Sequence, residues 1–194
     1  MVAHAYTEDQ LVEQPATELF AELGWQTLSA VEETFGKSGT LGRETSGDVI
    51  LTSLLRTALE RLNPQLPSEA IISAVDELTR DRSAMTLPGV NREVWTFLKD
   101  GIKVMVPDRK RGGLRDERVR VVDWENPEAN DFLLVSQMTV TGQLYTCRPD
   151  LIGFVNGLPW VVIELLYRSK CDAVFEHVYE SYYGDGSSVY QGVA

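Results

Sequence analysis

Apolar residues recur at helical spacing in several segments of the first hundred residues of the chain. Thr7 is a candidate N-cap for a helix that runs to Gly24, within which Pro15 marks either a kink or the true helix start. The same periodicity predicts three further helices, over Asp48 to Leu62, Ser68 to about Leu78, and about Val90 to Lys99. The N-terminal half is therefore expected to be mainly helical, with a short strand or an irregular segment over Trp25 to Glu33 between the first two helices.

From Ile102 onward the pattern changes to short alternating or apolar runs rich in β-formers. Strands are expected over Ile102 to Val106, Val119 to Trp124, and Phe132 to Val140. The basic segment Asp108 to Arg118 reads as a solvated hairpin loop or as a contact to DNA backbone, and a final helix is expected over Asp172 to Tyr183. Helices, then a mostly antiparallel sheet, then a helix indicate a single α/β or α+β domain.

The strongest local signal is a β-hairpin near residue 156. Apolar runs from Leu151 to Val155 and from Trp160 to Leu165 flank Asn156-Gly157, a dipeptide typical of tight hairpin turns. Asp150 precedes the first strand and Glu164 lies near the end of the second, in a run so apolar that burial on both faces is expected. A carboxylate there needs a partner, and two acidic groups meeting across paired strands can share a Mg²⁺ ion.

Composition and charge limit the classes of function that the chain can have. The 194 residues carry a net charge of −11, which argues against a domain that binds nucleic acid unaided, but less against a nuclease module delivered to DNA by partners. Cys147 and Cys171 match no metal-finger spacing. Neither a signal peptide nor a membrane span is evident, so a cytoplasmic protein is expected.

The segment Arg148-Pro149-Asp150 to Pro159, followed by Val161-Val162-Ile163-Glu164-Leu165, resembles the PD-(D/E)xK nuclease domain at the N-terminus of type I restriction enzyme R subunits. Leu59 to Ala70 is also similar to that domain. The resemblance implies a restriction-endonuclease-like mixed sheet flanked by helices. It covers roughly Glu8 to Leu165, which we assign as residues 1–165 of a truncated domain, with a divergent helix and tail at 166–194.

The resemblance assigns roles to individual residues. Asp150 and Glu164 would be catalytic metal ligands for Mg²⁺, joined by Glu13 of the first helix and the backbone carbonyl of Leu165. Both residues also have an ordinary structural explanation. Glu13 can be a solvated glutamate on a helix surface, and Asp150 can be an aspartate that begins a turn. Where the family has the motif lysine, this chain has Leu166.

Two basic residues and a tyrosine follow Leu166, the position at which the family has its lysine. Lys170 or Arg168 is a possible substitute for its charge. Tyr182 matches the tyrosine of the family's Gln-x-x-x-Tyr element, whereas Val178 replaces its glutamine. The resemblance also implies DNA, methylation subunits and specificity subunits as partners. ATP binding is expected only of the full-length family, because Gly36-Lys37-Ser38 lacks the first glycine of a phosphate loop.

Three functions stay open at this point. The first is a Mg²⁺-dependent DNA endonuclease domain of a type I restriction-modification R subunit. The second is a catalytically impaired, truncated remnant of that domain, which Leu166 favours. The third is an acidic interaction module without nuclease activity, which leaves Glu164 and the Pro149-Asp150 hairpin unexplained.

Overall fold

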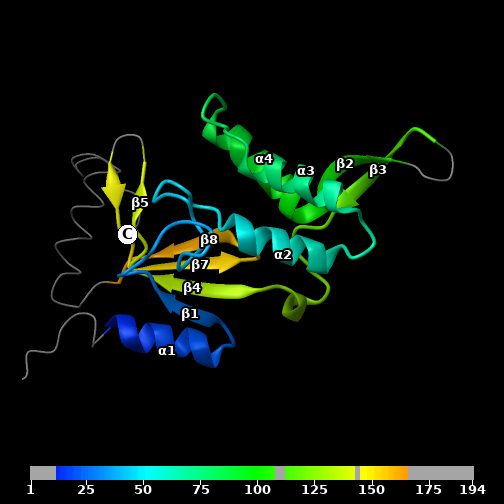
Figure 1. Cartoon of the computed structure of the whole chain (residues 1–194). Helices are drawn as coiled ribbons and strands as arrows, with labels where there is room; N and C mark the ends of the chain where they lie inside the picture. The colour runs from blue at the N-terminus through cyan, green and yellow to red at the C-terminus, as the bar shows by residue number, and fades with distance from the viewer. Residues whose placement is uncertain (1–11, 108–111, 143–144, 166–194) are drawn as a thin grey trace, which may run out of the picture.

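The structure, a computed structural model, describes residues 12–107, 112–142 and 145–165 (Figure 1). In chain order its helices and strands are α1 (Gln14–Glu22), β1 (Gln26–Ser29), α2 (Thr52–Leu62), α3 (Ser68–Thr79), α4 (Leu87–Asp100), β2 (Ile102–Pro107), β3 (Leu114–Val119), η2 (Pro127–Ala129), β4 (Phe132–Ser136), β5 (Val140–Thr141), β6 (Thr146–Cys147), β7 (Leu151–Val155) and β8 (Leu158–Ile163). The prediction of an α/β domain with a mixed sheet flanked by helices is confirmed. Within the described residues, no helix has the length and apolar character needed to cross a membrane.

The central sheet has four strands in the order β1-β4-β7-β8. β1 runs parallel to β4, whereas β4 and β7, and β7 and β8, are antiparallel pairs. Helix α1 lies alongside β1 and β4 (Figure 1). The ring of Trp25 lies 5.2 Å from that of Phe20 and 5.1 Å from that of Phe132, so these aromatic contacts tie α1 to the sheet.

A second layer contains α2, α3 and the β2–β3 hairpin. Helix α3 packs against both α2 and β2. The apolar stripes that predicted α2 and α3 supply its core, with Leu55, Leu59 and Ile71 almost completely buried. Leu158 of β8 belongs to the same cluster, which therefore continues into the central sheet.

The predicted Asn156-Gly157 turn is confirmed and lies at the junction of these layers. Both residues have positive φ, 52° and 78°, as a tight hairpin turn with right-handed strand twist requires. The amide of Asn156 is fully buried and donates to the Val121 carbonyl and to Asn130 Oδ1, each at 2.9 Å. A Cβ on Gly157 would lie 2.6 Å from the backbone nitrogen of Leu55, so both the φ angle and the close approach of α2 favour glycine.

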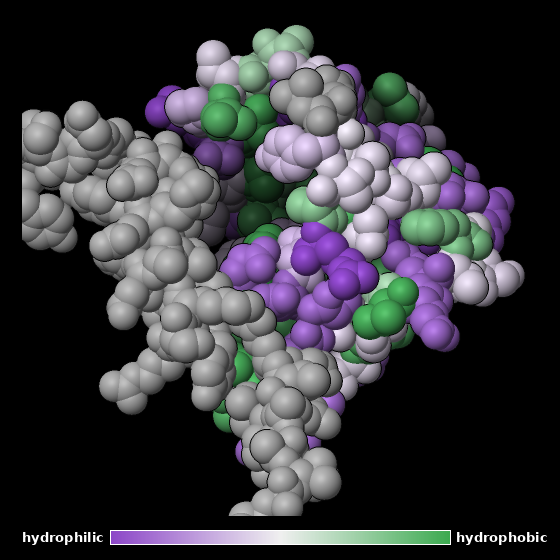
Figure 2. Space-filling view, turned by 90° about the vertical axis from the view of Figure 1, so that its left-hand side faces the viewer, coloured by the Kyte–Doolittle hydropathy of each residue, from purple (hydrophilic) through white to green (hydrophobic). Residues whose placement is uncertain are grey.

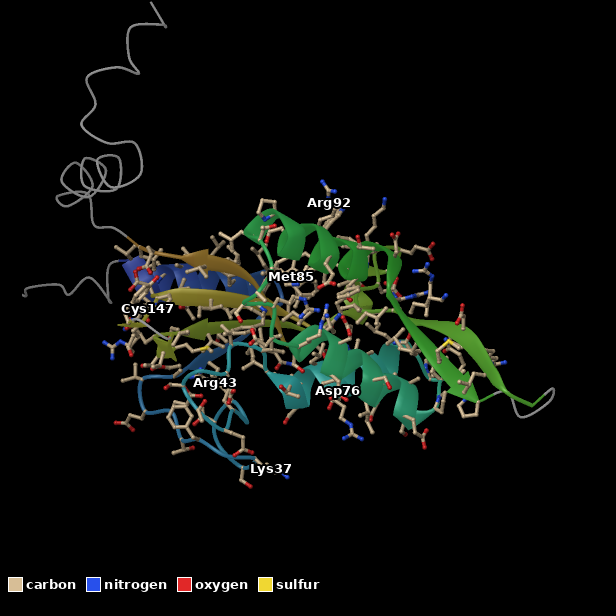
Figure 3. The ribbon with its side chains drawn as sticks, turned by 90° about the horizontal axis from the view of Figure 1, so that it is seen from above. Lys37, Arg43, Asp76, Met85, Arg92 and Cys147 are labelled. Carbon is tan, nitrogen blue, oxygen red and sulfur yellow. The ribbon has the colours of Figure 1, made fainter. Side chains whose placement is uncertain are left out.

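A long irregular segment, residues 30–51, connects β1 to α2 and is held by Arg43 (Figure 3). The Arg43 guanidinium is buried, pairs with the Glu33 carboxylate, and donates to the carbonyls of Asp48 and Thr139 at 3.0 Å each. Its carbon lies 5.5 Å from the centre of the Phe35 ring. Because Thr139 follows β4, Arg43 fastens this segment to the sheet near the end of that strand.

The predicted strand over Val119 to Trp124 is wrong. The strand is β3, Leu114–Val119, which pairs in antiparallel register with β2, so part of the segment expected to be a loop is extended. Beyond Val119, side chains accept backbone hydrogen bonds in place of a neighbouring strand. Asn63 Oδ1 accepts from the Arg120 N–H at 2.8 Å, and Asp123 Oδ1 accepts from the Asn126 N–H at 3.0 Å. Residues 108–111 lie outside the described part.

Other boundaries also move. The α-helix α1 begins at Gln14, with Pro15 in its first turn, but Val12 and Glu13 directly before it already form a π-helical turn. Pro15 therefore lies within helical backbone and does not mark its start, and Thr7 lies outside the described residues. The strand expected over Phe132 to Val140 ends at Ser136, because Gln137 adopts a left-handed backbone with φ 56°. The helix expected over Asp172 to Tyr183 lies outside the described residues.

The expectation that the strand leading to Glu164 is buried on both faces is wrong. β7 is buried throughout, but β8 is the edge strand, and Val162 is 59% exposed. Glu164 directly follows β8 and is itself exposed. An apolar run cannot distinguish a central strand from an edge strand, because sheet order is decided by pairing with distant segments.

Candidate active site

Strand pairing brings three polar residues to one end of the central sheet. Leu151 pairs with Ser136 of β4 on one side and with Ile163 of β8 on the other. The residues next to these partners are Gln137, Asp150 and Glu164, so the antiparallel register places them side by side. Figure 2 views the molecule from this end and shows hydrophilic residues gathered across the face beside a hydrophobic hollow.

Both carboxylate oxygens of Asp150 accept hydrogen bonds. Oδ2 accepts from the Leu165 backbone N–H at 2.7 Å, and Oδ1 accepts from Gln137 Nε2 at 3.3 Å. The Gln137 backbone N–H also donates to the Asp150 carbonyl at 2.9 Å. Asp150 is thus fixed at the start of β7 from both neighbouring strands. The contact recorded for Leu165 is through its N–H, and the carbonyl ligand assigned to it stays a prediction.

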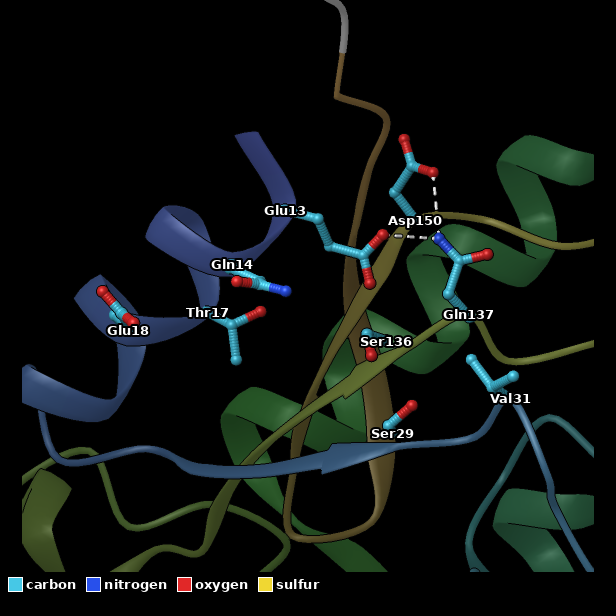
Figure 4. A pocket seen from close by; sticks show the side chains of 9 residues that line it. All are labelled: Glu13, Gln14, Thr17, Glu18, Ser29, Val31, Ser136, Gln137 and Asp150. Atoms are coloured by element: carbon cyan, nitrogen blue, oxygen red, sulfur yellow. Dashed lines mark hydrogen bonds between the residues drawn. The ribbon is translucent and has the colours of Figure 1, made fainter. Parts of the chain in front are cut away.

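Glu13 reaches the same end from the residue before α1. Its Oε2 accepts from Gln137 Nε2 at 2.7 Å, so one amide group links Glu13 to Asp150 (Figure 4). The structure therefore brings together the glutamate and the aspartate that the sequence singled out, although they are far apart in the chain. No cation of the described residues pairs with Glu13, Asp150 or Glu164.

The Glu164 carboxyl group faces Asp150. Although Glu164 is exposed, partial loss of hydration raises its pKa above the ordinary value, and the negative charge of Asp150 raises it further. Two carboxylates that repel each other in this way form a favourable environment for a cation. Among the described residues, however, no three Asp, Glu, His or Cys side chains gather closely enough to hold a metal ion by themselves.

A cleft of about 650 Å³ opens beside these residues. Its walls come from α1, from the ends of β1 and β4, and from the start of β7 (Figure 4). The lining residues are Glu13, Gln14, Thr17, Glu18, Ser29, Val31, Ser136, Gln137 and Asp150. Glu164 is not among them; it follows β8, which pairs with the side of β7 away from β4.

Gln137 is the site residue that sequence reasoning missed. It lies in a run predicted to be one continuous strand, and no local signal marks it. Its left-handed φ of 56° is uncommon for a residue other than glycine and turns the chain out of β4 at the site. The remaining assigned positions, Leu166, Arg168, Lys170 and Tyr182, all lie outside the described residues.

The oxygen donors fit a hard divalent cation. Mg²⁺ is bound in proteins mainly through oxygen atoms, and Glu13, Asp150 and Glu164 carry carboxylate oxygens at this end of the sheet. Gln137 carries an amide oxygen as well, although its nitrogen is the atom that faces Glu13 and Asp150. The absence of a pairing cation among the described residues agrees with this donor set.

Residues 5–181 match the family described as the N-terminus of the type I restriction enzyme R protein. The chain belongs to this family. The match extends past Leu165 to residue 181, and the boundary expected at residue 165 stays a prediction.

Curated relatives agree with the family match. The chain is 35% identical over 160 residues to the type I restriction enzyme HindI endonuclease subunit of Haemophilus influenzae, an alignment covering 79% of this chain and 14% of that protein. It is 28% identical over 163 residues to a Methanocaldococcus jannaschii protein assigned as the type I restriction enzyme MjaIXP endonuclease subunit, covering 81% of this chain and 15% of that protein. This R-protein domain thus spans about a seventh of the length of these relatives.

Proposed function

We propose that this chain carries the metal-binding carboxylates of a DNA endonuclease site, and that Leu166 leaves the site with little cleavage activity of its own. The observation that carries the proposal is the meeting of Asp150 with Glu164 and, through Gln137, with Glu13 at one end of the sheet. Relatives named as endonuclease subunits support the reaction class. Family membership also weighs against an unrelated acidic interaction module.

Asp150 and Glu164 would hold Mg²⁺, with Glu13 beside them. The bound ion supplies Lewis-acid chemistry, polarising a phosphodiester and lowering the pKa of an attacking water. The chain's own residues do the positioning: the Leu165 N–H and the Gln137 amide fix the two oxygens of Asp150. Glu164 must lose its proton to act as a ligand, so its raised pKa makes ion binding weaken as the medium becomes acidic.

The missing lysine accounts for the expected low activity. A lysine two residues after Glu164 would present an ammonium group to the attacked phosphate, whereas Leu166 offers no charge. Loss of one such charge-stabilising group typically lowers the rate by about 10²–10³. The net charge of −11 adds repulsion from duplex DNA. We therefore propose that the chain acts in the cytoplasm, with methylation and specificity subunits supplying cationic contacts to DNA.

Plasmid nicking at low salt with Mg²⁺ tests the proposal. The wild-type chain should match an Asp150→Ala blank, and Leu166→Lys should gain activity over both. If the wild type nicks DNA well above Asp150→Ala, the impaired-site proposal is wrong, and Arg168 and Lys170 become the substitutes to mutate. If Leu166→Lys gains nothing, the missing lysine does not explain the low activity.

A further inference from the structure

Gln137 occupies the position between two carboxylates that a cation would favour. Its single Nε2 atom lies 2.7 Å from Glu13 Oε2 and 3.3 Å from Asp150 Oδ1, which engages both amide hydrogens (Figure 4). No Lys or Arg of the described chain pairs with either carboxylate. A neutral amide therefore does the bridging, and no Lys or Arg among the described residues offsets the negative charge of the pair.

The backbone holds Gln137 in this position. Its N–H donates to the Asp150 carbonyl at 2.9 Å, and its φ of 56° lies in the left-handed region. A residue other than glycine in that region costs on the order of 1 kcal/mol, and such conformations cluster at functional sites. Since glycine would remove this cost, a glutamine here indicates a use for the side chain.

The amide group also carries an oxygen suited to a cation. A half-turn about the last side-chain torsion, which is broad and two-fold for glutamine, exchanges the nitrogen and the oxygen without moving any other atom. Glutamine carbonyls are ligands for hard divalent cations. In one orientation the residue bridges the carboxylates through its nitrogen. After the half-turn it can bind a cation through its oxygen.

We propose that Gln137 is a ligand residue of the divalent-cation site, contributing its amide oxygen beside the carboxylates of Glu13 and Asp150. This inference rests on the proposed function, because it assumes that these carboxylates bind the ion. It adds a residue from the end of β4 to a site otherwise built from the residue before α1 and the β7–β8 hairpin. Its test must separate loss of the ligand from loss of the fold.

Calorimetric titration with Mn²⁺, combined with thermal melting of each variant, makes that separation. Gln137→Gly removes the amide and suits the positive φ, so it should melt at or above the wild-type temperature. Its Mn²⁺ affinity should nevertheless fall by about 10–100-fold, the usual cost of losing a supporting group at a metal site. Gln137→Asn, which also tolerates positive φ but has a shorter reach, is the second variant and should bind Mn²⁺ more weakly than wild type.

Two further variants define the role. Gln137→Glu supplies an oxygen but no N–H, so it should bind Mn²⁺ at least as tightly as wild type. Thr17→Val is the matched control, because Thr17 lines the same cleft and has no hydrogen bond to either carboxylate in the described structure; it should leave the affinity unchanged.

The outcomes distinguish this inference from the proposed function. Wild-type Mn²⁺ affinity in Gln137→Gly, or equal losses in Gln137→Gly and Thr17→Val, overturns the role of Gln137 and leaves the carboxylate site standing. Loss in Gln137→Glu equal to that in Gln137→Gly overturns the oxygen-ligand role. Failure of the wild-type chain to bind Mn²⁺ more tightly than Asp150→Ala overturns the proposed metal site, and this inference with it.

Discussion

Replacing Arg43 by methionine should destabilise the domain strongly. Methionine retains much of the apolar stem but removes the guanidinium, which is completely buried and donates to the nearly buried Glu33 carboxylate and to the carbonyls of Asp48 and Thr139. The substitution leaves the Glu33 charge and both carbonyls without this donor. It also removes the cationic group that lies over the Phe35 ring.

The magnitude follows from burial. Removing one partner of a buried ion pair typically costs about 3–5 kcal/mol, because the other charge stays buried without compensation. Arg56→Met is the matched control, since Arg56 pairs with Glu60 while their side chains are 52% and 46% exposed. Losing an exposed pair at this spacing costs only about 0.3–0.5 kcal/mol. The two variants should therefore differ by roughly an order of magnitude in their free-energy cost.

Urea unfolding followed by tryptophan fluorescence measures the difference. With a urea slope of about 2 kcal/mol per M, Arg43→Met should lower the midpoint by about 1.5–2.5 M. The double variant Glu33→Gln with Arg43→Met should recover part of this loss, because it removes the stranded charge. An Arg43→Met cost no larger than that of Arg56→Met would refute the reasoning, as would a double variant less stable than Arg43→Met alone.

Two further predictions concern the hairpin turn and the response to pH. Gly157→Ala should lower the free energy of unfolding in urea by about 2–4 kcal/mol, because the added Cβ would crowd the Leu55 backbone at a position with positive φ. Gly24→Ala is the control, because Gly24 has φ 89° but lies in open space, and it should cost less. Equal costs would contradict the crowding argument. The Arg82 hydrogen bond lowers the pKa of Glu93 below its ordinary value of 4.5, so its stabilisation is present above that pH and lost as the pH falls through the lowered pKa. The stability gap between wild type and Glu93→Gln should narrow below pH 4.5, and a constant gap would rule out this linkage.

Features governed by neighbouring residues were predictable from the sequence. Helices α2 and α3 follow from apolar residues at helical spacing, which form one face only if the chain is helical. The β7–β8 turn follows from Asn156-Gly157, because these residues tolerate the positive φ angles that such a turn demands. The meeting of Asp150 and Glu164 follows as well, since a tight hairpin places the start of one strand beside the end of the other.

Only the tertiary structure decided the features that depend on distant partners. One is the position of β8 at the edge of the sheet. Another is the hydrogen bond from the Arg120 backbone N–H to the Asn63 side chain, which replaces a bond to a neighbouring strand. The third is the position of Gln137 between Glu13 and Asp150. Glu13 and Gln137 are 124 positions apart in the chain, so no local pattern of either segment encodes their contact. Apolar periodicity specifies which face of a segment is buried, whereas the choice of neighbour depends on packing and hydrogen bonding summed over the whole fold.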